Sequence, residues 1–267
     1  MASEHPYGRY DRSDDHAFPD DRVHNVLDTA RNDPRITAAI EAQNVNPVTR
    51  LGYNDHGPEH IDIVLNRALT LYDLLKRAEV PFMAAQDHDL DEADEAVIIA
   101  LGALLHDVGN MIHRDNHSHW SIPLAIPLLD DILTPHYDLP AQVQIKGEVL
   151  HAIICHHANE TPLTREAGIV RVADGLDMER GRSRTPYESG GRGINTVSSQ
   201  AIESVNLYEG DSVPVRVEIE MTNAAGVYQV DSLLKSKLTD SLLEEHTKIV
   251  AVNIGQSGNL IVDRVEL

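Results

Sequence analysis

The sequence predicts a mainly α-helical core followed by a small α+β C-terminal domain. Apolar residues recur with the 3.6-residue period of amphipathic helices from about residue 23 onward. The composition changes at the glycine-rich segment 188–193, and residues 213–221 then alternate between apolar and charged side chains, as in a half-buried strand. We therefore expect a flexible N-terminal arm over 1–22, a helical domain over 23–188 and an α+β domain over 189–267.

The N-terminal arm and the single cysteine indicate the cellular compartment of the protein. Residues 1–22 are rich in Asp, Arg, Tyr and His and lack an apolar period, and the first five residues give no sign of a secretory signal. No stretch approaches the ~18 apolar residues of a membrane span. One cysteine, Cys155, excludes an intrachain disulfide framework and suits a reducing compartment. We expect a cytoplasmic protein.

The acidic charge balance excludes one class of partner. The formal net charge is −21, from 22 basic and 43 acidic residues. Such a surface repels nucleic acid polymers and provides no basic footprint for them. The acidic residues are spread over the chain instead of forming a tail, which favours a solvated surface adapted to high salt. The composition therefore predicts a halophilic archaeal source.

A strongly amphipathic helix is predicted to begin at Pro58, because proline suits the first turn of a helix. His60 opens its apolar stripe and so points toward the core, and His56 lies just outside the helix, four residues earlier. The alternative for His60 is a buried histidine bonded to a backbone carbonyl group. The stripe continues through Val64, Ala68, Leu71 and Leu75.

The next helix leads into a His-Asp pair. The acidic segment 86–95 is not an EF-hand loop, because Glu92 occupies the position that requires glycine; it is instead predicted to be an acidic helix N-terminus. The apolar run that follows ends at Leu105, directly before His106-Asp107. An imidazole and a carboxylate on adjacent residues can reach one divalent metal.

Further histidines follow this pair, since most of the fifteen in the chain fall between residues 56 and 157. His117 shares a helix face with Ser121, Ala125 and Leu128, which leaves room for a ligand. His113 and His119 remain alternatives to it. The apolar helix from Val149 ends in His156-His157, and Asp174 lies on an apolar helical face. A buried carboxylate needs a partner, and a metal supplies one.

This order of residues resembles the HD superfamily of metal-dependent phosphohydrolases over roughly residues 20–185. The resemblance implies one metal held by His60, His106, Asp107 and Asp174, and a second bridged by Asp107 and held by His117 and His156. His106 and Asp107 are then the candidate catalytic residues. The His156-His157 pair and His56 resemble the HD-GYP branch. Asn110 replaces the lysine of that branch and a Gly-Tyr-Pro motif is missing, so cyclic-di-GMP hydrolysis is not carried over.

The ligand types indicate the metals. Imidazoles and carboxylates suit Mn, Fe, Ni or Zn, whereas the absence of clustered thiols argues against an Fe–S site. Because His56 and His157 exceed the needs of two metals, we expect two or three ions per chain. Two ions about 3.5–4 Å apart activate a hydroxide and clamp a phosphoryl group. Arg180, Arg182 and Arg184 are candidate phosphate-binding residues; the alternative is an ordinary solvated basic turn.

The C-terminal domain shows no clustered ligand set. We expect a helix bearing Val230, Leu233, Leu234, Leu238 and Leu242, strands near 249–254 and 260–266, and a further strand at 202–208. It is similar to the C-terminal extension of archaeal HD-domain hydrolases. Packing support or dimerisation is the expected role, and ligand sensing is the alternative.

Together these features predict a metal-dependent phosphohydrolase. The expected substrate is a phosphomonoester or cyclic phosphodiester of a nucleotide or related metabolite, attacked by a metal-activated hydroxide. The alternative is a metal-containing regulatory or ligand-binding protein with a sensing or dimerising C-terminal domain. We expect a small phosphorylated substrate, no nucleic acid polymer, no membrane and a homodimer. Aromatic residues make up only 4% of the chain, and Trp120 and Tyr187 are candidates for stacking on a base.

Overall fold

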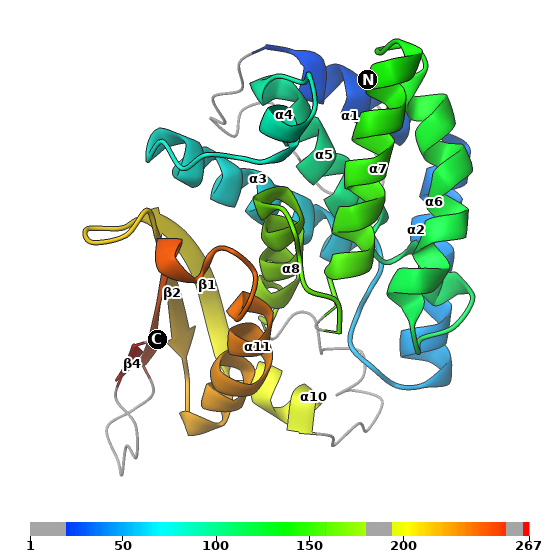
Figure 1. Cartoon of the computed structure of the whole chain (residues 1–267). Helices are drawn as coiled ribbons and strands as arrows, with labels where there is room; N and C mark the ends of the chain where they lie inside the picture. The colour runs from blue at the N-terminus through cyan, green and yellow to red at the C-terminus, as the bar shows by residue number, and fades with distance from the viewer. Residues whose placement is uncertain (1–19, 158, 180–193, 255–263, 267) are drawn as a thin grey trace, which may run out of the picture.

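The computed structural model describes residues 20–157, 159–179, 194–254 and 264–266 of the 267-residue chain. A bundle of helices occupies residues 22–176, and a four-stranded sheet with short helices follows it (Figure 1). This confirms the predicted fold class. The helices of the bundle are α1 (Arg22–Arg31), α2 (Pro34–Ala42), α3 (Pro58–Arg77), α4 (Ala84–Asp87), α5 (Glu92–Leu105), α6 (His117–Leu133), α7 (Leu139–Cys155) and α8 (Arg165–Leu176).

Two helices of the bundle begin at aspartate caps. Asp33 accepts a hydrogen bond from the backbone N–H of Arg35 at 2.8 Å, next to a proline in the first turn of α2. Asp91 and Asp94 form a reciprocal capping box at the start of α5. The acidic segment before α5 is therefore a helix N-terminus, as expected.

Helix α5 is the centre of the bundle, with α1, α3, α7 and α8 packed around it. Every residue of α5 after Glu92 is buried, so the helix is apolar on all sides. Each buried leucine, such as Leu101, contributes about 1.5–3 kcal/mol of transfer free energy to folding. The rigid central helix ends at Leu105 and fixes the His106-Asp107 pair in the middle of the bundle.

Two short helical segments bring neighbouring loops to the end of α5: a π-helix, η1 (Val45–Arg50), and a 3-10 helix, η2 (Val108–Met111). Gly109 in η2 lies so close to the start of α6 that an added Cβ would be 2.0 Å from the carbonyl oxygen of His117. Only glycine permits this approach. The close packing places the first residue of α6 beside the end of α5.

The sheet has the order β1-β2-β3-β4, from β1 (Ile202–Glu209), β2 (Val215–Met221), β3 (Thr247–Asn253) and β4 (Arg264–Glu266). β1 and β2 are antiparallel, with Val205 opposite Ile219, and β3 and β4 are also antiparallel. β2 and β3 are parallel, with Ile219 opposite Ala251. Alternate residues of β2 are buried, which confirms the predicted strand.

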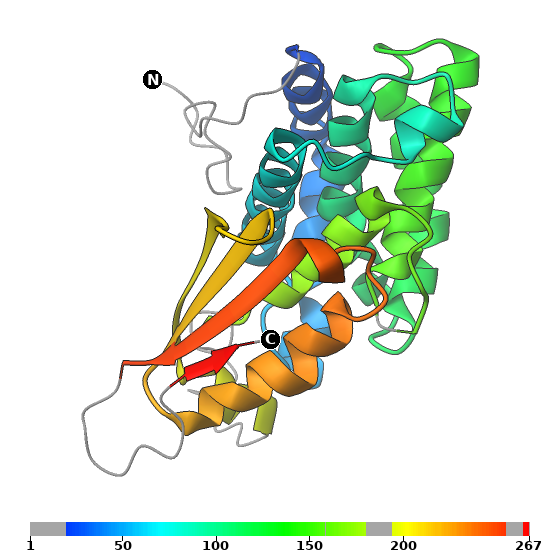
Figure 2. The same ribbon diagram turned by 60° about the vertical axis from the view of Figure 1, so that its left-hand side comes forward.

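A parallel pair requires a crossover connection. Here residues 222–246 make it, through the short segments η4 (Ala224–Gly226), η5 (Gln229–Leu234), α11 (Lys235–Leu238) and η6 (Glu244–His246). In Figures 1 and 2 this connection runs from the sheet to the helical bundle, where α11 packs on α8. The short helix α10 (Ile194–Ser199) precedes β1.

The helix of the crossover is shorter than predicted. It ends at Leu238, and Leu242 lies outside it with 38% of its surface exposed. Asp240 and Leu242 both adopt positive φ values, 57° and 65°, which are incompatible with a continuing helix. The turn packs tightly on α8, because a Cβ added at Gly168 would lie 1.9 Å from the Ser241 carbonyl oxygen.

Among the described residues, no helix is both long and apolar enough to cross a membrane. The glycine-rich segment 188–193 lies outside the described residues.

Candidate metal centre

Three helix ends converge on one buried group of side chains. His60 comes from the first turn of α3, His106-Asp107 from the end of α5, and Asp174 from the last turn of α8. The Nε2 atoms of His60 and His106 are 3.2 Å apart. Asp174 Oδ1 lies 3.4 Å from His60 Nε2 and 3.9 Å from His106 Nε2. The four residues predicted for one metal are therefore brought together.

Asp107 connects this group to a second one. Its Oδ2 faces the first group, at 3.4 Å from His60 Nε2 and 3.7 Å from His106 Nε2. Its Oδ1 faces the other way, at 3.1 Å from His117 Nε2 and 3.7 Å from His156 Nε2. One carboxylate thus presents one oxygen atom to each pair of histidines, which is the arrangement that a bridging ligand needs.

The histidines present metal-binding nitrogen atoms to this space. Each Nδ1 of four rings lies next to an oxygen acceptor and donates to it, which leaves the lone pair on Nε2. The donations run from His60 to Asp177 Oδ2 at 2.6 Å, from His106 to Ala103 O at 2.8 Å, from His117 to Arg114 O at 3.0 Å and from His156 to Ile153 O at 2.6 Å. The Nδ1 partner of His60 is a carboxylate, whereas the structural alternative expected a backbone carbonyl group there.

These facing lone pairs are compatible with a bound cation. The Nε2 atoms of His117 and His156 are only 2.9 Å apart, and neither carries a proton in the tautomer that its Nδ1 contact sets. Two such lone pairs repel each other unless a positive charge lies between or beside them. Divalent metal ions satisfy this donor set of imidazoles and carboxylates.

The protonation states also suit a metal. Burial lowers the pKa of His106, and it lowers the pKa of His156 well below its ordinary value, so both rings are neutral at pH 7. Burial alone would raise the pKa of Asp107, but the neighbouring His56, whose Nδ1 contacts the carboxylate, holds that pKa well below its usual range. Neutral imidazoles and an ionised carboxylate bind metal without first losing protons.

His56 also lies in this centre. The side chain of Gln43 donates to the His56 carbonyl oxygen at 2.5 Å, and Asn44 Oδ1 accepts from the His56 backbone N–H at 2.8 Å. These contacts place His56 Nδ1 2.6 Å from Asp107 Oδ2. Three overlapping groups of side chains within the described residues have metal-binding spacing: His56, His60 and Asp107; His60, His106 and Asp174; and His106, Asp107 and His156.

Comparison with known proteins agrees with this geometry. The family model described as HD domain matches residues 68–179, which include every ligand candidate from His106 to Asp174. An uncharacterized protein of Methanocaldococcus jannaschii, MJ1020, is 36% identical over 226 residues, covering 85% of this chain and 87% of that protein. The chain belongs to the HD-domain family. Ribonuclease Y of Desulforudis audaxviator is 28% identical over 171 residues, covering 61% of this chain and 30% of the ribonuclease.

Membership of this family places the chain in a superfamily of metal-dependent phosphohydrolases, whose HD domains bind divalent metals. The HD-domain match begins at residue 68, so His56 and His60 precede it. Their assignment to the centre rests on the distances given above.

The remaining histidines of the HD domain differ in position. His157 lies at the edge of the centre, with its ring centroid 5.4 Å from that of His117. His113 is exposed, and His119 is exposed beside Glu160. His151 accepts a hydrogen bond from the backbone N–H of Leu163 at 3.0 Å, outside the centre. Of the three histidines considered for the second group, His117 is therefore the one placed there.

A cleft of about 700 Å³ opens onto the centre. Its walls come from both parts of the molecule: His56, Asp107, His117, His157, Asp174 and Asp177 from the bundle, and Ile194, Gln229, Leu233 and Lys237 from the C-terminal part. Leu51, Tyr53 and Met178 add apolar surface, and Arg114 adds a guanidinium group.

Sequence reasoning missed three polar residues at this site. Asp177 orients His60, while Arg114 and Lys237 line the cleft. Asp177 follows Asp174 by three residues on the same helix end, a spacing that could have been noticed. Arg180, Arg182, Arg184 and Tyr187 lie outside the described residues. Trp120 is exposed on α6 and does not line this cleft.

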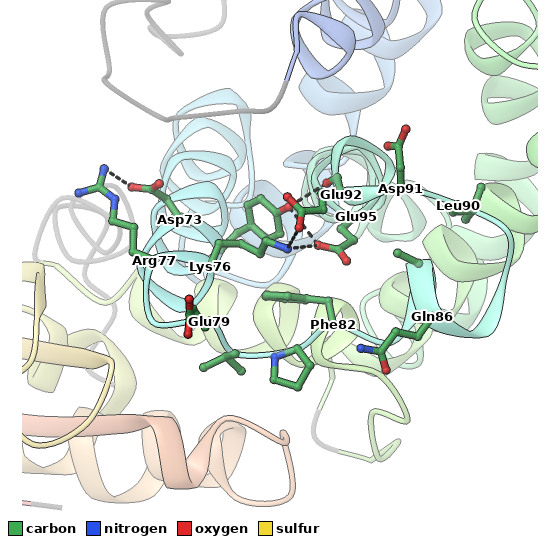
Figure 3. A pocket seen from close by; sticks show the side chains of 14 residues that line it. Asp73, Lys76, Arg77, Glu79, Phe82, Gln86, Leu90, Asp91, Glu92 and Glu95 are labelled. Carbon is green, nitrogen blue, oxygen red and sulfur yellow. Dashed lines mark hydrogen bonds and ion pairs between the residues drawn. The ribbon is translucent and has the colours of Figure 1, made fainter.

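A second cavity, of about 760 Å³, lies at the other end of α3 (Figure 3). His60 and Lys76 are sixteen positions apart on that helix, or about 24 Å at 1.5 Å per residue. Three polar groups of this cavity contact one another: Lys76 Nζ donates to Glu95 at 3.2 Å, and the Tyr72 hydroxyl donates to the same oxygen at 3.1 Å. No histidine of the described part of the chain lines it. This cavity is therefore separate from the metal centre and lacks its chemistry.

Proposed function

We propose that the protein hydrolyses a small phosphate ester, either a phosphomonoester or a cyclic phosphodiester of a nucleotide or related metabolite. The observation that carries this proposal is the position of Asp107 between two pairs of histidines. A carboxylate shared in this way suits a two-metal site for the in-line displacement at phosphorus. Bound divalent ions would supply an activated water molecule and would neutralise charge on the phosphate.

The side chains of the centre are arranged to hold two metal ions. Asp107 would hold both ions, with His60, His106 and Asp174 on one side and His117 and His156 on the other. The Nδ1 hydrogen bonds fix the ring orientations, so the ligands need little rearrangement when metal binds. His56, already 2.6 Å from Asp107, and His157 at the edge of the centre are available for a third ion.

The size of the cleft supports a small substrate. A volume of about 700 Å³ is within the range of small-molecule sites, and the apolar wall suits a base or another flat group. One of the similar proteins, from Desulforudis audaxviator, carries the name of a ribonuclease. A net charge of −21 disfavours a polymeric nucleic acid as substrate here, so we propose a mononucleotide-sized ester.

A substrate panel tests the proposal. Protein purified without chelator is assayed with phosphomonoesters and with cyclic nucleotides, in the presence of Mn²⁺, Fe²⁺, Ni²⁺ or Zn²⁺, at low salt and in molar KCl. Asp107→Asn should remove the activity and reduce the metal content, because it weakens both ion positions. Asp130→Asn is a matched control, since Asp130 pairs with Lys146 at the surface. Hydrolysis that is unchanged in Asp107→Asn would contradict the proposal.

One observation favours a second candidate function, a metal-containing ligand sensor. The C-terminal part forms a wall of the cleft, so a ligand bound there contacts both parts of the molecule. A sensor would bind a nucleotide tightly without turnover, whereas a hydrolase would convert it. Equilibrium binding and hydrolysis, measured with the same nucleotide, distinguish the sensor from the hydrolase.

A further inference from the structure

Lys237 reaches the metal centre from the C-terminal crossover. Its Nζ donates to Asp174 Oδ2 and, at 3.1 Å, to the carbonyl oxygen of His156. The side chain is 18% exposed and lines the cleft. This lysine is therefore a cation from one structural part placed against two candidate ligands of the other.

The backbone around Lys237 is anchored to the bundle. The buried Arg171 on α8 donates from Nη2 to the carbonyl oxygen atoms of Ser236 at 3.0 Å and Thr239 at 3.3 Å. These two residues flank Lys237 in sequence. The close approach of Ser241 to Gly168 fixes the same turn on α8. The bundle therefore fixes the backbone from which the Lys237 side chain extends.

Lys237 retains a donor for a ligand. An ammonium group has three N–H donors, and two are used by Asp174 and His156. No described residue accepts from the third. Asp174 turns Oδ1 toward His60 and His106 and Oδ2 toward Lys237, so it can bind a metal through Oδ1 while it keeps the lysine.

Arg114 adds a second cation at the cleft. Its Nη1 contacts Asn110 Oδ1 at 3.2 Å and lies 3.3 and 3.4 Å from the two ring nitrogen atoms of His117. Within the described part of the chain, Nε and Nη2 have no partner. An arginine with a free edge binds two oxygen atoms of a phosphate in parallel.

Both cations lie on the same side of the cleft. Arg114 contacts the ring of His117, Lys237 donates to the carbonyl oxygen of His156, and the Nε2 atoms of these two histidines are 2.9 Å apart. The two groups therefore concentrate positive charge at one side of the cleft, in a protein with a net charge of −21. A local excess of this kind is suited to an anion.

We propose that Lys237 and Arg114 form a phosphate-binding subsite next to the metal centre, so that the C-terminal part supplies a substrate-binding residue. The subsite deepens the proposed function and rests on it. The bound group would be a phosphate whose oxygen atoms accept from the third N–H of Lys237 and from the guanidinium edge of Arg114.

Binding of inorganic phosphate to Mn²⁺-loaded protein tests this subsite without turnover. Isothermal titration calorimetry at one fixed salt concentration is applied to the wild type, Lys237→Met and Arg114→Met. Lys235→Met is the matched control, because Lys235 is exposed on the same short helix and pairs with Asp231. Metal content and melting temperature are recorded for every protein.

We expect each of the two variants to weaken phosphate binding about tenfold or more, with metal content and melting temperature kept and Lys235→Met unchanged. Lys237→Arg should restore part of the affinity. Phosphate affinity within twofold of wild type in both variants would overturn the subsite. Loss of metal in parallel with phosphate would also overturn it, since Lys237 would then only support Asp174.

The same measurements separate the subsite from the proposed function. Wild-type protein that binds phosphate through both cations but hydrolyses no ester disproves the function and retains the subsite. Hydrolysis that continues at the wild-type kcat/KM in Lys237→Met and Arg114→Met disproves the subsite and retains the function.

Discussion

His60 Nδ1 lies 2.6 Å from Asp177 Oδ2, at the point where α3 and the end of α8 meet. Because the carboxylate accepts the Nδ1 proton, the opposite nitrogen of the ring is fixed as a metal-binding lone pair. Asp177 therefore acts on the metal centre indirectly, by orienting the His60 ring. Carboxylate–histidine pairs of this type orient and strengthen metal ligands.

Asp177→Ala should weaken metal binding about 10–100-fold, because His60 loses the acceptor that sets its tautomer. Asp177→Asn should have a smaller effect, since its amide oxygen can still accept. Competition with a chromophoric chelator measures the affinity, and Asp73→Ala, which removes an ion pair with Arg77 near the far end of α3, is the control. Equal affinities in Asp177→Ala and wild type would show that Asp177 does not orient His60.

Gly109→Ala should destabilise the protein, because the new Cβ would collide with the His117 backbone at the start of α6. Overpacking of this kind costs about 1–3 kcal/mol, and relief of the collision displaces His117 from Asp107. Both the melting temperature and the metal content should fall.

Gly147→Ala is the control for this change, since it lies within α7 and an added Cβ has nothing within 4 Å. Alanine is favoured over glycine there by about 0.5–1 kcal/mol, so Gly147→Ala should be neutral or stabilising. If Gly109→Ala melts at the wild-type temperature, the packing of η2 on α6 is looser than described.

Stability should fall as the pH decreases below about 6.5, the ordinary pKa of histidine. Burial lowers the pKa values of His106 and His156, so below pH 6.5 the unfolded chain binds more protons than the folded chain. Stability then rises with pH in this window and is independent of these two groups above it. Each group contributes up to about 1.4 kcal/mol per pH unit.

Melting of the metal-free protein from pH 4.5 to 8 measures this dependence, and His106→Gln should flatten the curve. The depressed pKa of Asp107 adds a loss of stability only at more acidic pH, as that carboxylate becomes protonated in the folded state. A melting temperature that is constant from pH 7 to 5 would rule out buried neutral histidines.

Salt should stabilise the fold, because a net charge of −21 creates self-repulsion that screening removes. We expect a melting temperature that rises from dilute buffer to molar KCl, and aggregation or unfolding on dialysis against dilute buffer. Parallel melts in KCl and in an equal concentration of uncharged osmolyte separate screening from general exclusion effects. Identical melts in dilute and molar KCl would contradict a halophilic adaptation.

The sequence predicted the position of a candidate ligand where that residue lies in or next to a helix with a clear apolar pattern. The stripe of α3 predicted that His60 points inward, and the buried run of α5 predicted where His106-Asp107 would lie. The sequence alone could not choose among His113, His117 and His119, because the choice depends on the tight contact between Gly109 and α6.

Residues that join the site through tertiary packing were not predictable in this way. Lys237 is 63 positions from Asp174, and no local pattern marks it. Its position follows from a parallel strand pair and a crossover that only the folded sheet defines. The early end of α11 was also not predictable from a local pattern. The spacing of Leu242 continues the apolar period of the helix, but the helix ends before it, at the turn that packs against Gly168.

The parallel pairing of β2 with β3 also has a kinetic consequence. β3 can dock beside β2 only after residues 222–246 have closed a loop over α8, and the metal centre needs a longer closure, because His60 and Asp177 are 117 positions apart in sequence. The chain loses conformational entropy when a loop closes, before the contacts that offset this loss have formed. Non-local pairings of this kind are therefore slow steps in folding. During synthesis, the chain contains all candidate metal ligands, up to Asp174, before Lys237 is added. We therefore expect metal uptake to precede phosphate affinity when both are followed during cell-free synthesis.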